Sequence, residues 1–129
     1  MSVFIERARI SLRSVAVLLE LGDTNSAGGR AYYAIFDAMR AVLPERTDLN
    51  LESIKTHHGL FVMFERHILA TGLMDAEKAR IIYRTQELRW SADYSHAVQI
   101  EKSAVSGVIA PATDFIEACA RLVAANGGS

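Results

Sequence analysis

The sequence predicts an all-α protein, an up-and-down bundle of about five helices, on three observations. Apolar residues recur at helical spacing along the chain, and no segment alternates between apolar and polar residues as a half-buried strand would. Half of the 129 residues are hydrophobic, which is enough for one core in one domain. The connections between the periodic segments are short, as in antiparallel bundles. We therefore expect one helical domain at 1–125 and a flexible tail at 126–129.

The first two helices are predicted from their apolar stripes and from the residues at their ends. The first runs from about Ser2 to Leu21, with Gly22 as its C-terminal cap. The second runs from about Ser26 to Leu43, and we expect it to stop at Pro44 because proline cannot donate a helical hydrogen bond. Two apolar stripes cover a wide arc of this second helix, so it is either central in the bundle or covered by a second subunit. The stripes are Ala31, Ile35, Ala38 and Val42, and Tyr32, Phe36, Met39 and Leu43.

Three more helices follow a long connection at 44–55. The third covers about 56–70 and ends at Gly72. The fourth starts near Asp75, a good N-cap, and continues to about His96 with a thin apolar stripe. The fifth covers about 101–124, and Pro111 inside it predicts a kink or a break.

Composition and motifs exclude several classes of function. A net charge of −1 and a pI of about 6.4 give no support for tight nucleic-acid binding by the whole surface, although they allow a local basic site. No apolar run approaches the length of a membrane span, so we expect a cytoplasmic protein. The single cysteine, Cys119, is expected to be a small buried hydrophobe. No phosphate-binding glycine motif and no HExxH pattern occurs, and we expect neither a cofactor nor a metal.

The segment from Arg89 to His96 holds the most polar chemistry in the chain. On a helix Arg89, Asp93 and His96 lie at i, i+4 and i+7, within about 60° of one face. A fixed cation beside an imidazole is a minimal set of groups for phosphodiester chemistry. Spacing alone also fits a solvated helix end whose histidine interacts with the helix dipole.

Two further segments have structural interpretations. The adjacent pair His57–His58 cannot serve one metal from a regular helix, and a histidine there is expected to tie down the preceding loop. In the segment Arg30–Phe36 we expect a core helix whose tyrosine rings pack while their hydroxyl groups form hydrogen bonds.

Three separated segments resemble one known family. Residues 30–38 resemble the second-helix signature of the bacterial HEPN domain, and 55–59 followed by Phe64 resemble the start of its third helix. Arg89, Ala92, Asp93 and Tyr94 resemble the motif near the end of its fourth helix. The segments occur in the family's order over nearly the whole chain. The resemblance implies a HEPN-like bundle of the small stand-alone type, which usually forms homodimers.

The resemblance also implies an activity and a partner. Many HEPN proteins are metal-independent endoribonucleases with an Arg-x(4–6)-His motif, and six residues separate Arg89 from His96. Such proteins often act as the toxin of a toxin–antitoxin pair, in which a minimal nucleotidyltransferase is the antitoxin and can adenylylate a tyrosine. Tyr94 stands at that tyrosine's position. In the implied reaction Arg89 binds the scissile phosphate of RNA, His96 transfers a proton, and Asp93 orients one of them.

The spacing of Arg89 and His96 favours a site built from two chains. Composition favours an alternative function without catalysis. Seven residues place Arg89 and His96 about 10.5 Å apart along a helix axis, so a homodimer that pools two copies would ease the fit. The alternative is a non-catalytic dimerisation or nucleotide-binding module that serves a nucleotidyltransferase. The near-neutral charge favours it, as does Trp90, which stands where active family members often carry a polar residue.

Overall fold

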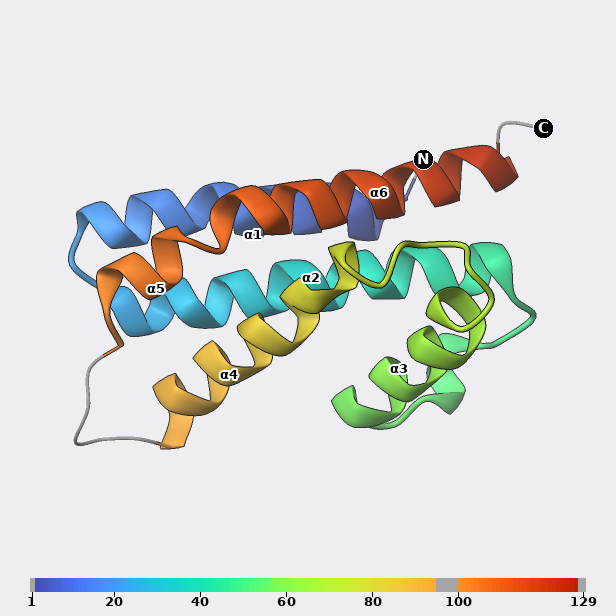
Figure 1. Ribbon diagram of the computed structural model, residues 1–129, viewed down its shortest axis with the longest axis horizontal. Coiled ribbons are helices and arrows are strands. Elements are labelled where there is room, and N and C mark those ends of the chain that lie inside the picture. Colours follow the sequence, from blue (N-terminus) through green and yellow to red (C-terminus); the bar gives the residue numbers. More distant parts are fainter. Residues whose placement is uncertain (1, 95–99, 128–129) are drawn as a thin grey trace.

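The computed structural model describes residues 2–94 and 100–127, and every regular element within these two ranges is helical. This confirms the predicted all-α class. The long helix α2 (Thr24–Arg46) lies at the centre and contacts α1, α3, α4 and α6. Figure 1 shows α1 and α6 side by side along one side of α2, and α4 and α3 on the opposite side.

Helix α1 (Val3–Glu20) begins and ends as its sequence predicts. The Ser2 hydroxyl accepts hydrogen bonds from the amides of Phe4 and Ile5, and satisfies two donors of the first turn. At the other end Gly22 adopts a φ of 81°, and the amide of Asp23 donates to the carbonyl of Leu18 at 2.9 Å. This is a glycine-terminated helix end in the left-handed conformation.

Helix α2 is longer than predicted at both ends. It starts at Thr24, because the Asp23 carboxylate caps it by accepting from the amide of Ser26 at 3.2 Å. The prediction that it stops at Pro44 is wrong, since Pro44 lies inside the helix. Proline removes only one donor, and the last turn is stabilised when the Thr47 hydroxyl donates to the carbonyl of Leu43.

The wide apolar arc of α2 is covered within this chain. Both predicted stripes are buried, apart from Phe36, which is partly buried against the same core. Because α1, α3, α4 and α6 all pack on α2, its arc is explained by a central position and gives no indication of a second subunit.

Helix α3 (His57–Phe64) is preceded by a short 3₁₀ turn, η1 (Leu51–Ser53), and continues as a π turn, η2 (Glu65–Leu69). Thr56 caps α3 by accepting from the amide of Gly59 at 2.8 Å. Gly72, with a φ of 78°, ends the segment as predicted. The cap therefore fixes where α3 begins, and it places His57 as the first residue of the helix.

Helix α4 (Ile81–Tyr94) starts later than predicted. Asp75 caps a tight turn, because its carboxylate accepts from the amide of Glu77 and its carbonyl accepts from the amide of Lys78. The turn leads through the 3₁₀ helix η3 (Lys78–Arg80) into α4. The fourth-helix stripe is buried at Ile81, Thr85 and Leu88.

The predicted fifth helix is divided in two, α5 (Lys102–Ser106) and α6 (Ile109–Gly127). The predicted break occurs at Gly107 and Val108, just before Pro111. Pro111 lies in the first turn of α6, where an amide donor has no helical partner. The carbonyl of Gly107 instead accepts from Arg84 Nη2 at 3.4 Å. Helix α6 includes 126–127, two of the four residues expected in the tail.

Helix α4 packs on α2 beside Gly28. A methyl group added at Gly28 would lie 3.5 Å from Leu88 Cβ, an ordinary van der Waals distance, so Leu88 lies next to the backbone of α2 at this point. Leu88 directly precedes Arg89, and this packing brings the polar end of α4 against the first half of α2. Within the described residues, no helix is long and apolar enough to cross a membrane.

Candidate functional site

The guanidinium of Arg89 lies where three helices meet. Its Nη1 atom is 3.1 Å from Nδ1 of His57, the first residue of α3. Its Cζ atom lies 4.9 Å from the ring centroid of Tyr32 and 5.7 Å from that of Tyr33, both on α2. These distances are typical of a cation over an aromatic ring. We call Tyr32, His57 and Arg89 the Arg89 cluster.

His57 is oriented by aromatic rings and by a second hydrogen bond. Its ring centroid lies 4.4 Å from that of Phe36. The Tyr32 hydroxyl lies 3.0 Å from the same Nδ1 atom that Arg89 contacts. A guanidinium can only donate, so we assign Nδ1 as the acceptor and place the imidazole proton on Nε2. The Tyr32 hydroxyl then also donates toward Nδ1, and two donors share one lone pair.

The surroundings keep both neutral members of the cluster uncharged near neutral pH. Burial lowers the pKa of His57, and the positive charges of Arg89 and Arg40 lower it further. Burial raises the pKa of Tyr32, while Arg89 opposes this rise. Arg89 is therefore held by an uncharged imidazole and a protonated phenol.

Two open depressions flank the cluster and make it accessible. One has a volume of about 200 Å³, and its lining is Tyr32, His58, Gln86, Arg89 and Trp90. The other has a volume of about 210 Å³ and includes His57, Phe36, Arg40 and Lys55 in its lining. A ligand on either side would meet cationic and aromatic side chains together, the combination that binds phosphate and base in single-stranded nucleic acid.

The structure describes one of the four predicted site side chains. Arg89 is half-buried in the cluster. Asp93 and Tyr94 belong to the last turn of α4, but their side chains fall outside the description. His96 lies in 95–99, outside the described residues. The placement of these three side chains relative to Arg89 stays a prediction.

The sequence interpretation missed His57 as a member of this site. One histidine of the pair His57–His58 was expected to tie down the preceding loop, whereas the hydrogen bonds and ring contacts of His57 are with Arg89 and with the rings of α2. The expectation for Tyr32 is confirmed, since its ring is buried and its hydroxyl forms a hydrogen bond. The joint occurrence of the three family segments could have indicated this site. Each segment contributes one member of the Arg89 cluster: Tyr32, His57 and Arg89.

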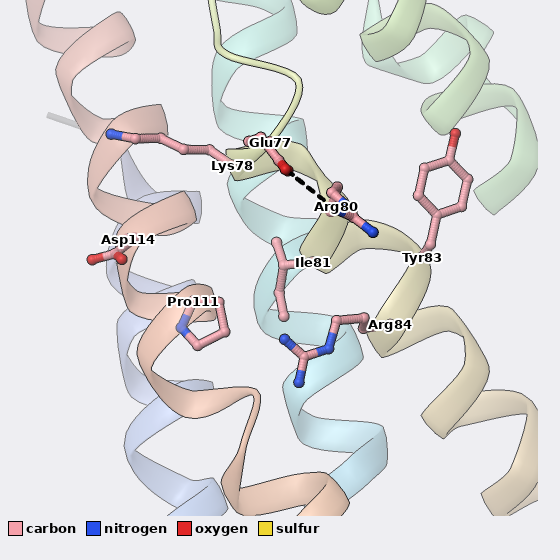
Figure 2. Close-up of a pocket in the computed structure, with 8 residues that line it drawn as sticks. All are labelled: Glu77, Lys78, Arg80, Ile81, Tyr83, Arg84, Pro111 and Asp114. Atoms are coloured by element: carbon pink, nitrogen blue, oxygen red, sulfur yellow. Dashed lines mark hydrogen bonds and ion pairs between the residues drawn. The ribbon is translucent and has the colours of Figure 1, made fainter.

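A larger pocket lies elsewhere, between the start of α4 and α6 (Figure 2). Its volume is about 630 Å³, and its lining is Glu77, Lys78, Arg80, Ile81, Tyr83, Arg84, Pro111 and Asp114. Glu77 and Arg80 form an ion pair across 3.2 Å, and the lining mixes both signs of charge. None of the predicted site residues lines it, so the Arg89 cluster is the better candidate.

No metal centre is evident in the described part of the chain. Across 2–94 and 100–127, no three acidic, histidine or cysteine side chains gather as metal ligands would. Cys119 is fully buried in the core as expected, and burial raises its pKa well above the ordinary value of a thiol.

Comparison with known proteins agrees with these motifs. Residues 1–122 match the model of the HEPN domain. A protein of Thermotoga maritima named "UPF0332 protein" is 31% identical over 117 residues, which cover 91% of this chain and 86% of that one. A protein of Methanocaldococcus jannaschii named "Putative toxin MJ0605" is 34% identical over 113 residues, covering 88% and 81% of the two chains. A second protein of that organism, "Putative toxin MJ0142", is 30% identical over 98 residues, covering 76% and 64%.

Proposed function

The chain belongs to the HEPN domain family, and from this premise we propose that it is a metal-independent endoribonuclease, the toxin of a toxin–antitoxin pair. Two relatives carry the word toxin in their names, which supports the biological role. The reaction is supported by the chemistry of the site.

The observation that carries the proposal is the position of the Arg89 guanidinium. It lies at an open depression and contacts an imidazole and two aromatic faces. An arginine fixed at an accessible surface is suited to bind a phosphodiester through two parallel N–H groups. The negative charge that develops on the phosphorus-bound oxygens would be stabilised by the same contact.

In the proposed reaction the 2′-hydroxyl of RNA attacks the neighbouring phosphorus. The new bond joins the 2′ oxygen to phosphorus, and the bond from phosphorus to the 5′ oxygen of the next nucleotide breaks. His96 either takes the proton from the attacking hydroxyl or gives one to the leaving oxygen, and water exchanges the other proton. Asp93 orients Arg89 or His96. The chemistry requires a 2′-hydroxyl, so DNA is not a substrate.

We propose that the working site is composite, with Arg89 of one subunit and His96 of its partner in a homodimer. The axial separation of these residues in one helix favours two contributing chains. Helix α4 also exposes two aromatic side chains seven residues apart, Tyr83 at 53% and Trp90 at 62%. Such a surface is suited to being covered by a second copy.

Tyr94 is the proposed site of regulation. On an ideal helix it projects about 140° from Arg89, so it need not take part in the reaction. Adenylylation there by a minimal nucleotidyltransferase would add bulk and negative charge at the edge of the site, and would oppose the entry of RNA. The intact mass after co-expression with such an enzyme tests this. An unchanged mass, or an added mass that persists in Tyr94→Phe, would count against it.

The activity is tested with purified dimer, RNA and excess EDTA. We expect wild-type protein to cleave RNA and to spare the same sequence with 2′-deoxy sugars, and we expect His96→Ala to lose activity by at least about a hundredfold. Cleavage of RNA by His96→Ala at the wild-type rate would refute the scheme.

A non-catalytic module remains the second candidate, and Trp90 favours it. Its side chain is 62% exposed beside Arg89, where it would stack on a nucleotide or a partner surface. This candidate predicts a stable complex with a nucleotidyltransferase or a nucleotide, and no RNA cleavage at any protein concentration.

A further inference from the structure

The motif at the start of α3 supplies none of the groups that transfer protons or bind phosphate in the proposed reaction, yet its histidine, His57, contacts Arg89. We propose that His57 is a positioning residue of the active site, whose Nδ1 atom holds the Arg89 guanidinium against Tyr32 so that its remaining N–H groups face the phosphate. The inference rests on the proposed ribonuclease function, because it assigns a part in that reaction.

The imidazole itself has little freedom. The Thr56 cap fixes the first turn of α3, and His57 is the first helical residue. Its ring packs against Phe36, with centroids 4.4 Å apart. It is tilted against the ring of Tyr32 at 5.6 Å and nearly perpendicular to that of Tyr33 at 6.1 Å. A ring held on several sides presents its Nδ1 atom in one direction.

This acceptor restricts the arginine. A free arginine side chain loses rotamer entropy when it binds a ligand. The contact of Nη1 with His57 at 3.1 Å fixes one corner of the planar fork, and the ring of Tyr32 at 4.9 Å fixes its face. With a corner and a face fixed, the direction of the other N–H groups is set before RNA binds.

An uncharged acceptor suits this task better than a carboxylate would. An ion pair satisfies a guanidinium electrostatically, whereas an imidazole nitrogen orients it and leaves the positive charge to attract phosphate. If His57 gained a proton, Nδ1 would become a donor and a second positive charge would face Arg89.

Burial and two of the charged groups around His57, Arg89 and Arg40, disfavour that proton. Helix α2 contributes Tyr32, Tyr33 and Arg40, and α4 contributes Arg89. Lys55, in the chain just before α3, lines the same depression as His57. None of these neighbours supplies a negative charge at neutral pH.

The test compares two replacements of His57 with a matched control. His57→Asn keeps an acceptor oxygen near the position of Nδ1, and His57→Leu keeps similar bulk without an acceptor. His67→Leu removes another half-buried histidine, which lies in η2 and outside the cluster. Each variant dimer is assayed for RNA cleavage across pH, with kcat and KM separated and with melting temperatures measured.

We expect His57→Leu to lower kcat/KM roughly tenfold to thirtyfold, and His57→Asn to recover to within about threefold of wild type. His67→Leu should cleave as wild type does. Wild type should lose more activity at acid pH than His57→Asn does, because protonation of His57 adds to any acid limb due to His96, which both proteins keep. Full activity of His57→Leu, or equal losses in both His57 variants, would overturn the inference.

A spectroscopic measurement separates this inference from the proposed function. Long-range ¹H–¹⁵N spectra of the histidine rings, without RNA, report which nitrogen of His57 carries the proton. We expect the Nε2–H form in wild type and a shifted Nδ1 resonance in Arg89→Met. A proton on Nδ1 in wild type would refute the positioning role. If this spectrum is as expected but no RNA is cleaved, the proposed function fails while the contact stands.

Discussion

Two arginines on opposite sides of α2 show how the same type of side chain can either stabilise the fold or form a functional site. Arg9 of α1 donates to both carboxylate oxygens of Glu117 on α6, at 2.8 and 2.9 Å, and to Glu6 at 2.9 Å. Arg89 of α4 contacts the imidazole of His57 and two tyrosine rings. The first arginine is matched by carboxylates, whereas these contacts of the second are with groups that carry no charge.

The difference between these partners distinguishes an arginine that stabilises the fold from an arginine in a candidate functional site. The hydrogen bonds from Arg9 lower the pKa of Glu117, as expected for a carboxylate held in its charged form by a cation. That ion pair joins α1 to α6. Because the carboxylates of Glu117 and Glu6 already accept from the Arg9 guanidinium, Arg9 is poorly suited to bind an anionic ligand. The contacts of Arg89 with His57 and with the two tyrosine rings add no negative charge, so the side of α2 that carries α3 and α4 is the one suited to chemistry (Figure 1).

The largest expected effect contrasts the two arginines directly. Arg89→Ala should reduce RNA cleavage by at least about a hundredfold, because it removes a charge that stabilises the transition state. Arg9→Ala should stay within about threefold of wild type. Both are measured as kcat/KM on one RNA substrate. Equal losses in the two variants would show that stability alone explains the effect.

A smaller effect is expected from the hydroxyl of Tyr32. Tyr32→Phe keeps the ring under Arg89 and removes one donor to His57, so cleavage should fall roughly threefold to tenfold, the equivalent of one hydrogen bond of about 1 kcal/mol. Tyr32→Leu, which also removes the aromatic face, should lose more. If Tyr32→Phe equals Tyr32→Leu, the ring has no part in holding Arg89.

On the α1–α6 side, the corresponding change should affect stability alone. Both Arg9 and Glu117 are partly exposed, so Glu117→Gln should lower the free energy of unfolding by only about 0.5–1 kcal/mol. Urea titrations at low and high salt measure this loss. It should shrink at high salt because ions screen the pair, and RNA cleavage should not change. A loss that is independent of salt would assign the effect to packing.

The smallest expected effect is a pH dependence of stability due to His57. Burial, Arg89 and Arg40 lower its pKa in the folded state, so below about pH 6.5 the unfolded chain binds more protons than the folded one. Stability should therefore fall as the pH drops through this range, by a larger amount in wild type than in His57→Asn. Urea titrations at several pH values provide the comparison, and identical slopes would indicate an ordinary pKa for His57.

Local signals predicted much of the fold. The caps of α1, the end after η2 at Gly72 and the buried stripes of α2 followed from glycine, serine and apolar spacing. Pro44 misled the prediction because the cost of a proline inside a helix, about 3 kcal/mol or more, is offset by the burial of the helix that surrounds it. Asp75 misled it because a good capping residue serves a tight turn as well as a helix.

The site was less predictable, for a physical reason. Arg89 and His57 are 32 residues apart, and no periodicity of either helix encodes their contact. It depends on how α3 and α4 pack against α2. Only the joint occurrence of the three family segments pointed to one place in the fold.

The central claim, a ribonuclease site shared by two subunits, is tested most directly by mixing two inactive variants. Arg89→Ala and His96→Ala are each expected to be inactive. A mixed dimer of the two would hold one intact site, with His96 from the first variant and Arg89 from the second. After random exchange of equal amounts, half of the dimers are mixed, and each mixed dimer has one intact site out of two. We therefore predict about a quarter of the cleavage activity of the same amount of wild-type protein. A mixture that exchanges subunits but stays inactive, beside an active wild-type dimer, would contradict the shared site.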